Sequence, residues 1–144
     1  MILTTLILIN IIWVGYALTE GVREGFYWHY ENNSRRVCEF DINPIFNLQR
    51  ALVMLIMGGF MVHTLGWFSL FSLACMFLMF NFFHNGTYYY TRNKLQSGVY
   101  PKGWFDESKS FPPFHTSLYT YKKRTISLIL GLATQIFVYI FLLS

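Results

Sequence analysis

Charged residues are confined to two windows of the chain, and everything outside them is uncharged. All 18 Asp, Glu, Lys and Arg residues lie at positions 20–50 or 92–124. The uncharged stretches cover residues 1–19, 51–91 and 125–144, and apolar side chains dominate them. An α-helix crosses the hydrocarbon core of a bilayer with about 20 apolar residues. The pattern therefore predicts an integral membrane protein.

The middle uncharged stretch is long enough for two crossings. Its 41 residues include His63-Thr64-Leu65-Gly66-Trp67 near the centre, where glycine permits a tight turn. Residues 1–19 lack the basic start and the small-residue cleavage site of a signal peptide, so we expect them to remain as a span. The prediction is an all-α integral membrane protein with four transmembrane helices at about 1–20, 44–65, 67–90 and 125–143, a tight outer hairpin between helices 2 and 3, and two long cytoplasmic loops at about 21–43 and 91–124, in a single domain over residues 1–144.

The basic residues predict the orientation. All 11 Lys and Arg residues lie in the two charged windows, which fall at the same end of the predicted helices. Because Lys and Arg near span ends are retained in the cytoplasm, we expect both termini outside and both loops inside, in a bacterial inner membrane or a viral membrane. The net charge of +4 indicates attraction to anionic lipid headgroups on the cytoplasmic side.

Composition excludes several classes of protein. The chain has 144 residues, of which 54% are hydrophobic and 12% charged, about half the charged fraction of a soluble domain. It has no room for a large soluble catalytic domain, and its basic residues are better explained by headgroups than by nucleic acid. Its two cysteines, Cys38 and Cys75, lie at different predicted depths, so we expect free thiols rather than a disulfide framework.

Polar residues gather at one predicted depth. With the turn near Gly66 as a ruler and a rise of about 1.5 Å per residue, His84 is level with Arg50, and Glu20 is close to the same level. On the third span four polar positions recur at i, i+3, i+4 and i+7, which is one helix face. The predicted polar layer, at the cytoplasmic edge of the bilayer, consists of Glu20, Arg23, Glu24, Gln49, Arg50, Asn81, His84, Asn85 and Tyr88.

Two interpretations of this layer stay open. In the structural one, Glu20 or Glu24 pairs with Arg50 and holds three helices in register. In the functional one, Glu20, Glu24 and His84 are catalytic candidates that exchange protons, because ionisable groups within a membrane are functional candidates. A single divalent metal is a weaker alternative, since the chain lacks the Glu-x-x-His pairs of di-metal carboxylate bundles. We therefore expect no metal site and no cofactor.

Four further residues are predicted to make helix contacts. Gly58 and Gly59 are small enough to let the second span approach a neighbour closely. Asn10 and Gln135 fall near mid-membrane by the same helical rise and are expected to hydrogen-bond to each other. Such a bond would fix which helices are neighbours.

The sequence leaves two functions open. It contains no G-x-S-x-G, no phosphate-binding glycine loop, no C-x-x-C and no H-E-x-x-H, which disfavours common enzymes. The first hypothesis is a non-enzymatic subunit that assembles into a homo-oligomer or with a partner membrane subunit and can form a pore. It docks through the aromatic-rich loop at 91–124 and through the end of the first helix, which we expect to project into the cytoplasm as far as about Asn32. The alternative is a membrane-embedded enzyme or an ion or proton transporter that uses the polar layer. A viral membrane component or a bilayer-disrupting effector also fits this small size.

Overall fold

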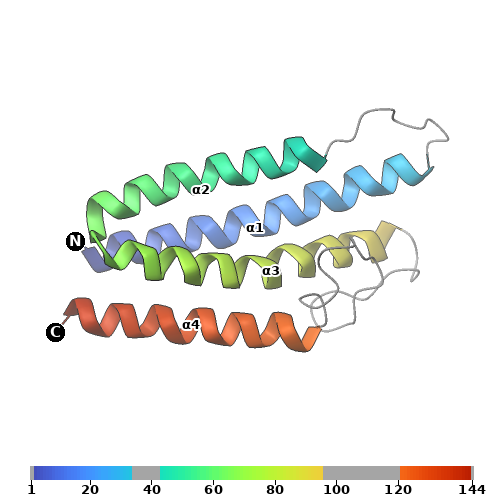
Figure 1. The fold of residues 1–144 in the computed structure, drawn as a ribbon. Coiled ribbons are helices and arrows are strands. Elements are labelled where there is room, and N and C mark those ends of the chain that lie inside the picture. The colour runs from blue at the N-terminus through green and yellow to red at the C-terminus, as the bar shows by residue number, and fades with distance from the viewer. Residues whose placement is uncertain (1, 34–42, 96–120, 144) are drawn as a thin grey trace.

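A computed structural model of the chain describes residues 2–33, 43–95 and 121–143. Apart from the turn at Gly66 and Trp67, these residues are helical (Figure 1), and each helix is long and apolar enough to cross a membrane. The helices are α1 Ile2–Asn33, α2 Asn43–Leu65, α3 Phe68–Leu95 and α4 Tyr121–Leu143. Residues 34–42 and 96–120, with Cys38 and most of the aromatic-rich loop, lie outside the described residues.

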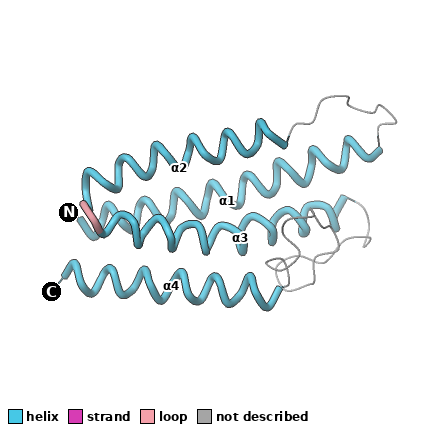
Figure 2. Tube along the Cα trace, viewed as in Figure 1, coloured by secondary structure: helices cyan, strands magenta, loops and turns pink. Residues whose placement is uncertain are grey.

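The helices lie side by side, and α3 is the central one. It packs most extensively against α1 and α4, and less against α2. Both termini and the α2–α3 turn lie at one end of the bundle (Figure 1), which we call the turn end. The two long connections leave from the opposite end, as the trace in Figure 2 shows. Successive helices therefore alternate in direction, as four successive crossings require.

The turn between α2 and α3 consists of Gly66 and Trp67. Gly66 has a φ of 57°, in the left-handed region that glycine enters without steric cost. Its N–H donates to the Val62 carbonyl at 3.0 Å, and its own carbonyl accepts from the Ser69 hydroxyl at 2.6 Å. These bonds satisfy backbone groups that a helix end leaves open. The glycine in the middle of the long uncharged stretch is thus where the chain reverses.

Three helices extend beyond their predicted membrane spans, because residues 21–33, 91–95 and 121–124 are helical. The largest difference is in α1, which continues to Asn33. Its charged side chains Glu20, Arg23 and Glu24 do not end the helix, since each finds a partner on the helix itself or on a neighbour. The continuation of α1 past its span, which the helical spacing of Glu20, Glu24 and Tyr27 predicts, is therefore confirmed.

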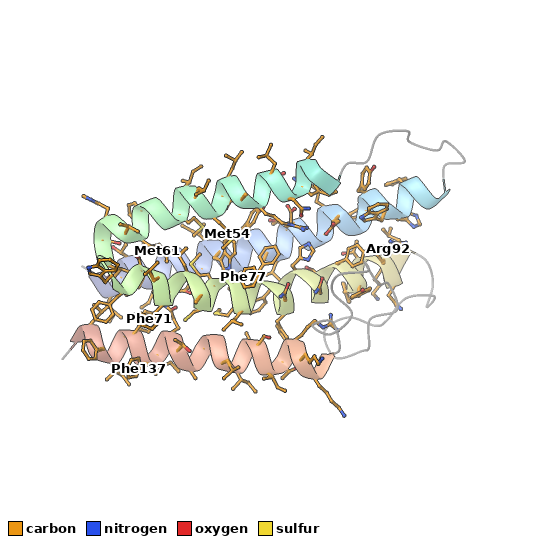
Figure 3. The ribbon with its side chains drawn as sticks, viewed as in Figure 1. Met54, Met61, Phe71, Phe77, Arg92 and Phe137 are labelled. Carbon is orange, nitrogen blue, oxygen red and sulfur yellow. The ribbon has the colours of Figure 1, made fainter. Side chains whose placement is uncertain are left out.

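The apolar core lies toward the turn end, between α1, α2 and α3. It is built from Leu6, Ile9, Trp13, Met61, Leu65 and Met76. The Trp13 side chain is 1% exposed, and its indole N–H donates to the Met76 carbonyl at 2.7 Å. That bond crosses from α1 to α3 and satisfies the one polar group of a large buried ring. Figure 3 shows Met61 on the inner side of α2 and Phe137 on the outer side of α4.

Candidate functional site

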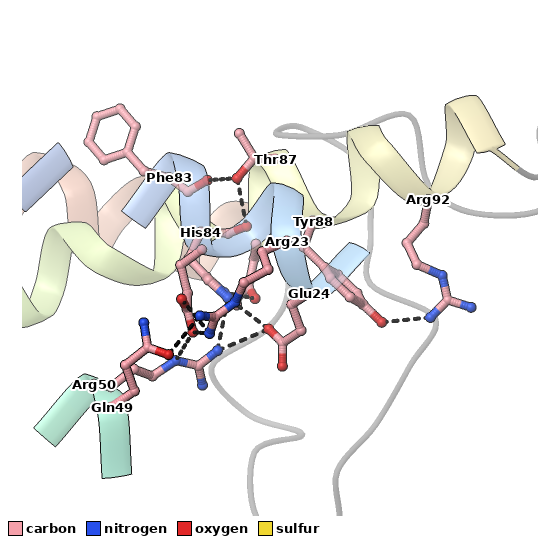
Figure 4. Close-up of polar contacts among 11 residues, drawn as sticks. Arg23, Glu24, Gln49, Arg50, Phe83, His84, Thr87, Tyr88 and Arg92 are labelled. Carbon is pink, nitrogen blue, oxygen red and sulfur yellow. Dashed lines mark hydrogen bonds and ion pairs between the residues drawn. The ribbon is translucent and has the colours of Figure 1, made fainter. Parts of the chain in front are cut away.

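Three helices bring charged side chains together in the half of the bundle away from the turn (Figure 4). The Glu20 carboxylate, on α1, is the most deeply placed, with 2% of its side chain exposed. One of its oxygens lies 2.8 Å from Arg23 Nη2, and the other lies 3.4 Å from Arg50 Nε on α2. A buried carboxylate needs such partners, because isolated charge in a low dielectric is costly.

Glu24, one turn along α1, joins the other two helices. Its Oε2 atom lies 2.9 Å from Arg50 Nη2 on α2 and 2.8 Å from His84 Nε2 on α3. The same Arg50 nitrogen is 3.0 Å from His84 Nε2. The predicted contact of Arg50 with Glu20 or Glu24 is therefore present with both carboxylates, and His84 closes the group from the third helix.

Around this centre lie most of the remaining predicted residues. Gln49 Oε1 accepts from Arg23 Nη1 at 2.6 Å, and Asn85 Oδ1 lies 3.3 Å from His84 Nδ1. The Tyr88 ring stacks on the His84 ring with an interplanar angle of 7°, and its hydroxyl accepts from Arg92 Nη1 at 2.8 Å. Of the nine residues predicted for the layer, the structure joins eight; Asn81, half-buried on α3, makes no hydrogen bond to any of them.

Two glycines on α1 bring the layer together, and the sequence reasoning missed them. A Cβ atom at Gly21 would overlap Thr87 Oγ1 and the His84 carbonyl oxygen, and one at Gly25 would lie 2.9 Å from Thr91 Cβ. The backbones of α1 and α3 are thus in direct contact at the level of Glu20 and Glu24. The signal was present as G-x-x-x-G, the spacing that permits close helix approach in membranes. It was overlooked because Arg23 and Glu24 lie inside it.

The layer is electrically balanced. Glu20 and Glu24 carry two negative charges, and Arg23 and Arg50 carry two positive charges, so the sum is zero when His84 is neutral. Aromatic rings cover the guanidinium groups: Arg50 Cζ lies 5.7 Å from the Phe80 ring centre, and Arg23 Cζ lies 4.7 Å from that of Phe46. Each carboxylate already accepts a hydrogen bond from an arginine.

Within the described residues, no group of three or more His, Cys, Asp or Glu side chains is placed to hold a metal ion. The nearest approach to such a group is Glu20, Glu24 and His84, and both of these carboxylates are in contact with arginine. A guanidinium at that distance competes with a cation for the same oxygens. That the chain uses no cofactor stays a prediction.

The predicted bond between Asn10 and Gln135 is wrong. Asn10 Nδ2 instead donates to the Tyr139 hydroxyl on α4 at 2.9 Å and to the Leu6 carbonyl at 2.8 Å. Gln135, one turn before Tyr139, faces α3, where its Nε2 lies 3.4 Å from Ser72 Oγ. The partner of Asn10 on α4 is thus the residue one turn beyond Gln135, and Gln135 itself faces another helix.

The predicted glycine contacts divide in two. Gly58 faces α3, where a Cβ would lie 3.5 Å from the Leu73 side chain. Gly59 has nothing within 4 Å. The closest approach of α4 is at Gly131, where a Cβ would lie 2.8 Å from Met79 Cγ and 3.1 Å from the Cys75 carbonyl oxygen.

Comparisons with known proteins give no relative. No protein-family model matches the chain, and no curated protein or solved structure matches it. The function must therefore be argued from the site and the surface alone.

Proposed function

We propose that this chain is a non-enzymatic membrane subunit that assembles with copies of itself, and that its polar layer holds three of its own helices together. One observation carries the second half of this proposal. Both carboxylates of the layer are engaged with arginines of the same chain, at 2.8 and 3.4 Å for Glu20 and at 2.9 Å for Glu24. Carboxylates that are already paired with arginine hold α1, α2 and α3 in register and are not free to act on a substrate.

The outward face of α2 supports assembly. Gly59 lies on that face, and a Cβ atom there would have no neighbour within 4 Å. Leu55, one turn earlier, is 70% exposed. His63, one turn later, is also exposed. In lipid a small residue allows close helix packing, and a polar side chain needs a partner. A second copy of α2 would supply both, which makes this face the proposed interface.

The membrane and its orientation belong to the same proposal. The charged ends of the helices would face the cytoplasm, in a bacterial inner membrane or a viral membrane, with anionic headgroups around them. The α2–α3 turn and both termini would then lie outside. A partner membrane subunit in place of a second copy, and a pore formed by the assembly, remain outcomes that stoichiometry and conductance would reveal.

The interface is tested by adding bulk at Gly59. Gly59→Leu should shift subunit counts toward monomers in single-molecule photobleaching of labelled protein in native membrane vesicles. Ala133→Leu is the matched control, because Ala133 is exposed on α4 and gains the same kind of side chain. Unchanged subunit counts in Gly59→Leu, or equal loss in both variants, would contradict the proposed interface.

One contact favours the alternative of a membrane-embedded enzyme or a proton transporter. Glu24 and His84 lie 2.8 Å apart, the geometry of a carboxylate and an imidazole that share a proton. Under this alternative, Glu24→Gln and His84→Ala abolish an activity while expression and assembly stay intact. Loss of folding in both variants favours a structural role for the polar layer.

A further inference from the structure

Three side-chain atoms from three helices form a triangle inside the polar layer. Arg50 Nη2 lies 2.9 Å from Glu24 Oε2 and 3.0 Å from His84 Nε2, and the last two atoms are 2.8 Å apart. A guanidinium nitrogen only donates, and a carboxylate oxygen only accepts. His84 Nε2 must accept to bond with Arg50 and must donate to bond with Glu24. It therefore satisfies one of these neighbours at a time.

In the neutral state the ring bonds to α2. Asn85 Oδ1, 3.3 Å from Nδ1, is an acceptor and selects the tautomer that carries its proton on Nδ1. The lone pair of Nε2 then accepts from Arg50 Nη2. This bond ties α2 to α3 directly, while Glu24 Oε2 accepts from Arg50 alone.

Addition of a proton reverses this preference. A proton taken from water onto Nε2 makes the ring an imidazolium, which donates to Asn85 Oδ1 and to Glu24 Oε2. The bond with Arg50 is lost, and two positive groups now lie 3.0 Å apart. Protonation thus exchanges a contact between α3 and α2 for a contact between α3 and α1.

The charges around the ring determine which helix responds. Glu20, Arg23 and Glu24 on α1 and Arg50 on α2 sum to zero, so the imidazolium leaves the layer with one excess positive charge. On α3 itself Tyr88 stacks on the ring and accepts from Arg92, and from α4 Arg124 lies over the Tyr89 ring. Arg50 is the group in direct contact with His84 that this positive charge repels.

Helix α2 is the element able to move. Its span is 17% buried, the same share as that of α4 and less than the 33% of α1 and 39% of α3, but α4 packs extensively on α3 while α2 makes few contacts with any helix. At its inner end, the half that carries Arg50, it is held by Arg50, by Gln49 bonded to Arg23, and by the Phe46 ring against Tyr27. Its other end is tied to α3 by the two-residue turn. Loss of the bond between Arg50 and His84 therefore loosens this end of α2, while the turn keeps the other end fixed.

We propose that protonation of His84 releases the inner end of α2, so that the triangle of Glu24, Arg50 and His84 is a proton-operated clasp within the bundle. The inference concerns contacts within one chain. It can fail while the assembly proposal holds, and it can hold if the chain proves monomeric.

The experiment measures distances between spin labels in the full-length protein, reconstituted in nanodiscs at pH 8 and pH 5. Cys38→Ser and Cys75→Ala remove the native thiols. Labels at Leu48 and Ile126, which are 60% and 55% exposed, report the inner end of α2 against α4. Labels at Val62 and Phe137, exposed near the turn end, provide the control pair. Dilution with unlabelled protein removes distances between copies.

We expect the Leu48–Ile126 distance to become longer and broader at pH 5, while the Val62–Phe137 distance stays unchanged. His84→Gln should abolish this shift, and His63→Gln, which removes an imidazole from α2 itself, should preserve it. A wild-type distance that does not change between the two pH values overturns the clasp, and so does a shift that persists in His84→Gln. If His84→Gln does not fold, ¹⁵N NMR of His84 in the wild type decides, because Nε2 must gain its proton over the same pH range as the distance change.

Discussion

Glu20 illustrates how much of this structure depends on single side chains. Its carboxylate is 2% exposed, accepts a hydrogen bond from Arg23 on the same helix and forms an ion pair with Arg50 on α2. A buried ion pair adds little to stability over a well-packed apolar replacement, but removal of one partner leaves an uncompensated charge. The neutrality of the layer therefore matters more than any single contact in it.

This argument predicts a non-additive pair of substitutions. Glu20→Gln leaves the layer with a net positive charge and should lower the free energy of unfolding by about 3–5 kcal/mol. Adding Arg23→Gln restores neutrality, so the double variant should be more stable than Glu20→Gln alone. Denaturant titration in mixed micelles measures both. A double variant whose loss equals the sum of the two single losses would show that charge balance is not what stabilises the layer.

The close contact between α1 and α3 can be tested by substitution of two glycines of α1. An added Cβ at Gly21 overlaps backbone and side-chain atoms of α3, whereas one at Gly15 meets nothing within 4 Å. Gly21→Ala should cost about 1–3 kcal/mol through overpacking. Gly15→Ala should be neutral or stabilising by up to about 1 kcal/mol, because alanine favours the helix. Thermal unfolding of both variants in detergent distinguishes them, and equal melting temperatures would contradict the close α1–α3 contact.

At the scale of elements, the bundle is organised around α3, which packs against α1 and α4 through small residues on those helices. Gly21 and Gly25 let α1 approach, and Gly131 lets α4 approach. Helix α2 lacks such a contact along most of its length and relies on its turn, on the core near Met61 and on the polar layer. Helix α2 is therefore the least firmly attached helix of the bundle.

The docking of α4 can be tested with a matched pair of substitutions. Gly131→Leu places a large side chain where even a Cβ lies 2.8 Å from Met79, so α4 must move away from α3. Ala133→Leu adds a leucine on the exposed face of the same helix. We expect Gly131→Leu to make α4 accessible to limited proteolysis in micelles and Ala133→Leu to resemble the wild type. Equal protection in both variants would argue against the contact at Gly131.

The sequence predicted the positions of the helices better than the directions in which their side chains point. The four helices and the reversal at Gly66 follow from the length of the uncharged stretches and from glycine, and the shared depth of Glu20, Arg50 and His84 follows from the helical rise. Depth does not determine which way a side chain turns, so Gln135 was paired with Asn10 when it faces Ser72. The spacing of Gly21 and Gly25 was readable in the sequence and the helix was expected to continue through both, but their close contact with α3 was not predicted.

At the scale of the whole molecule, the apolar exterior continues past the polar layer. On α1 the exposed residues Val22, Phe26 and Tyr30 follow Glu20, and Tyr30 lies about 15 Å further along the helix. On α2 the exposed Ile45 and Leu48 lie beyond Arg50 in the same direction. The α1 and α3 helices themselves also continue beyond the layer, to Tyr30 and Leu95. We infer that α1 keeps an apolar, lipid-facing surface past the layer as far as Phe26; that the layer lies at the cytoplasmic edge of the bilayer stays a prediction.

This lipid-facing surface predicts how a probe at Phe26 behaves. A fluorophore on Phe26→Cys, in a background without Cys38 and Cys75, should be quenched by lipids with a nitroxide on the acyl chain. It should be protected from iodide in water. A fluorophore on Trp67→Cys, at the 85% exposed tip of the turn, serves as the interfacial control. Strong quenching of the Phe26 probe by iodide would show that this position is in water and would contradict the lipid-facing surface at Phe26.

The central claim is that this chain is an assembling subunit, and native mass spectrometry of the protein extracted gently from its own membrane tests it most directly. That measurement detects stoichiometry, partner chains, bound lipid and metal together. We predict a homo-oligomer without metal, and a shift to monomers in Gly59→Leu but not in Ala133→Leu. A monomer that carries a metal ion or one retained lipid would contradict the account and would make Glu20, Glu24 and His84 an active site.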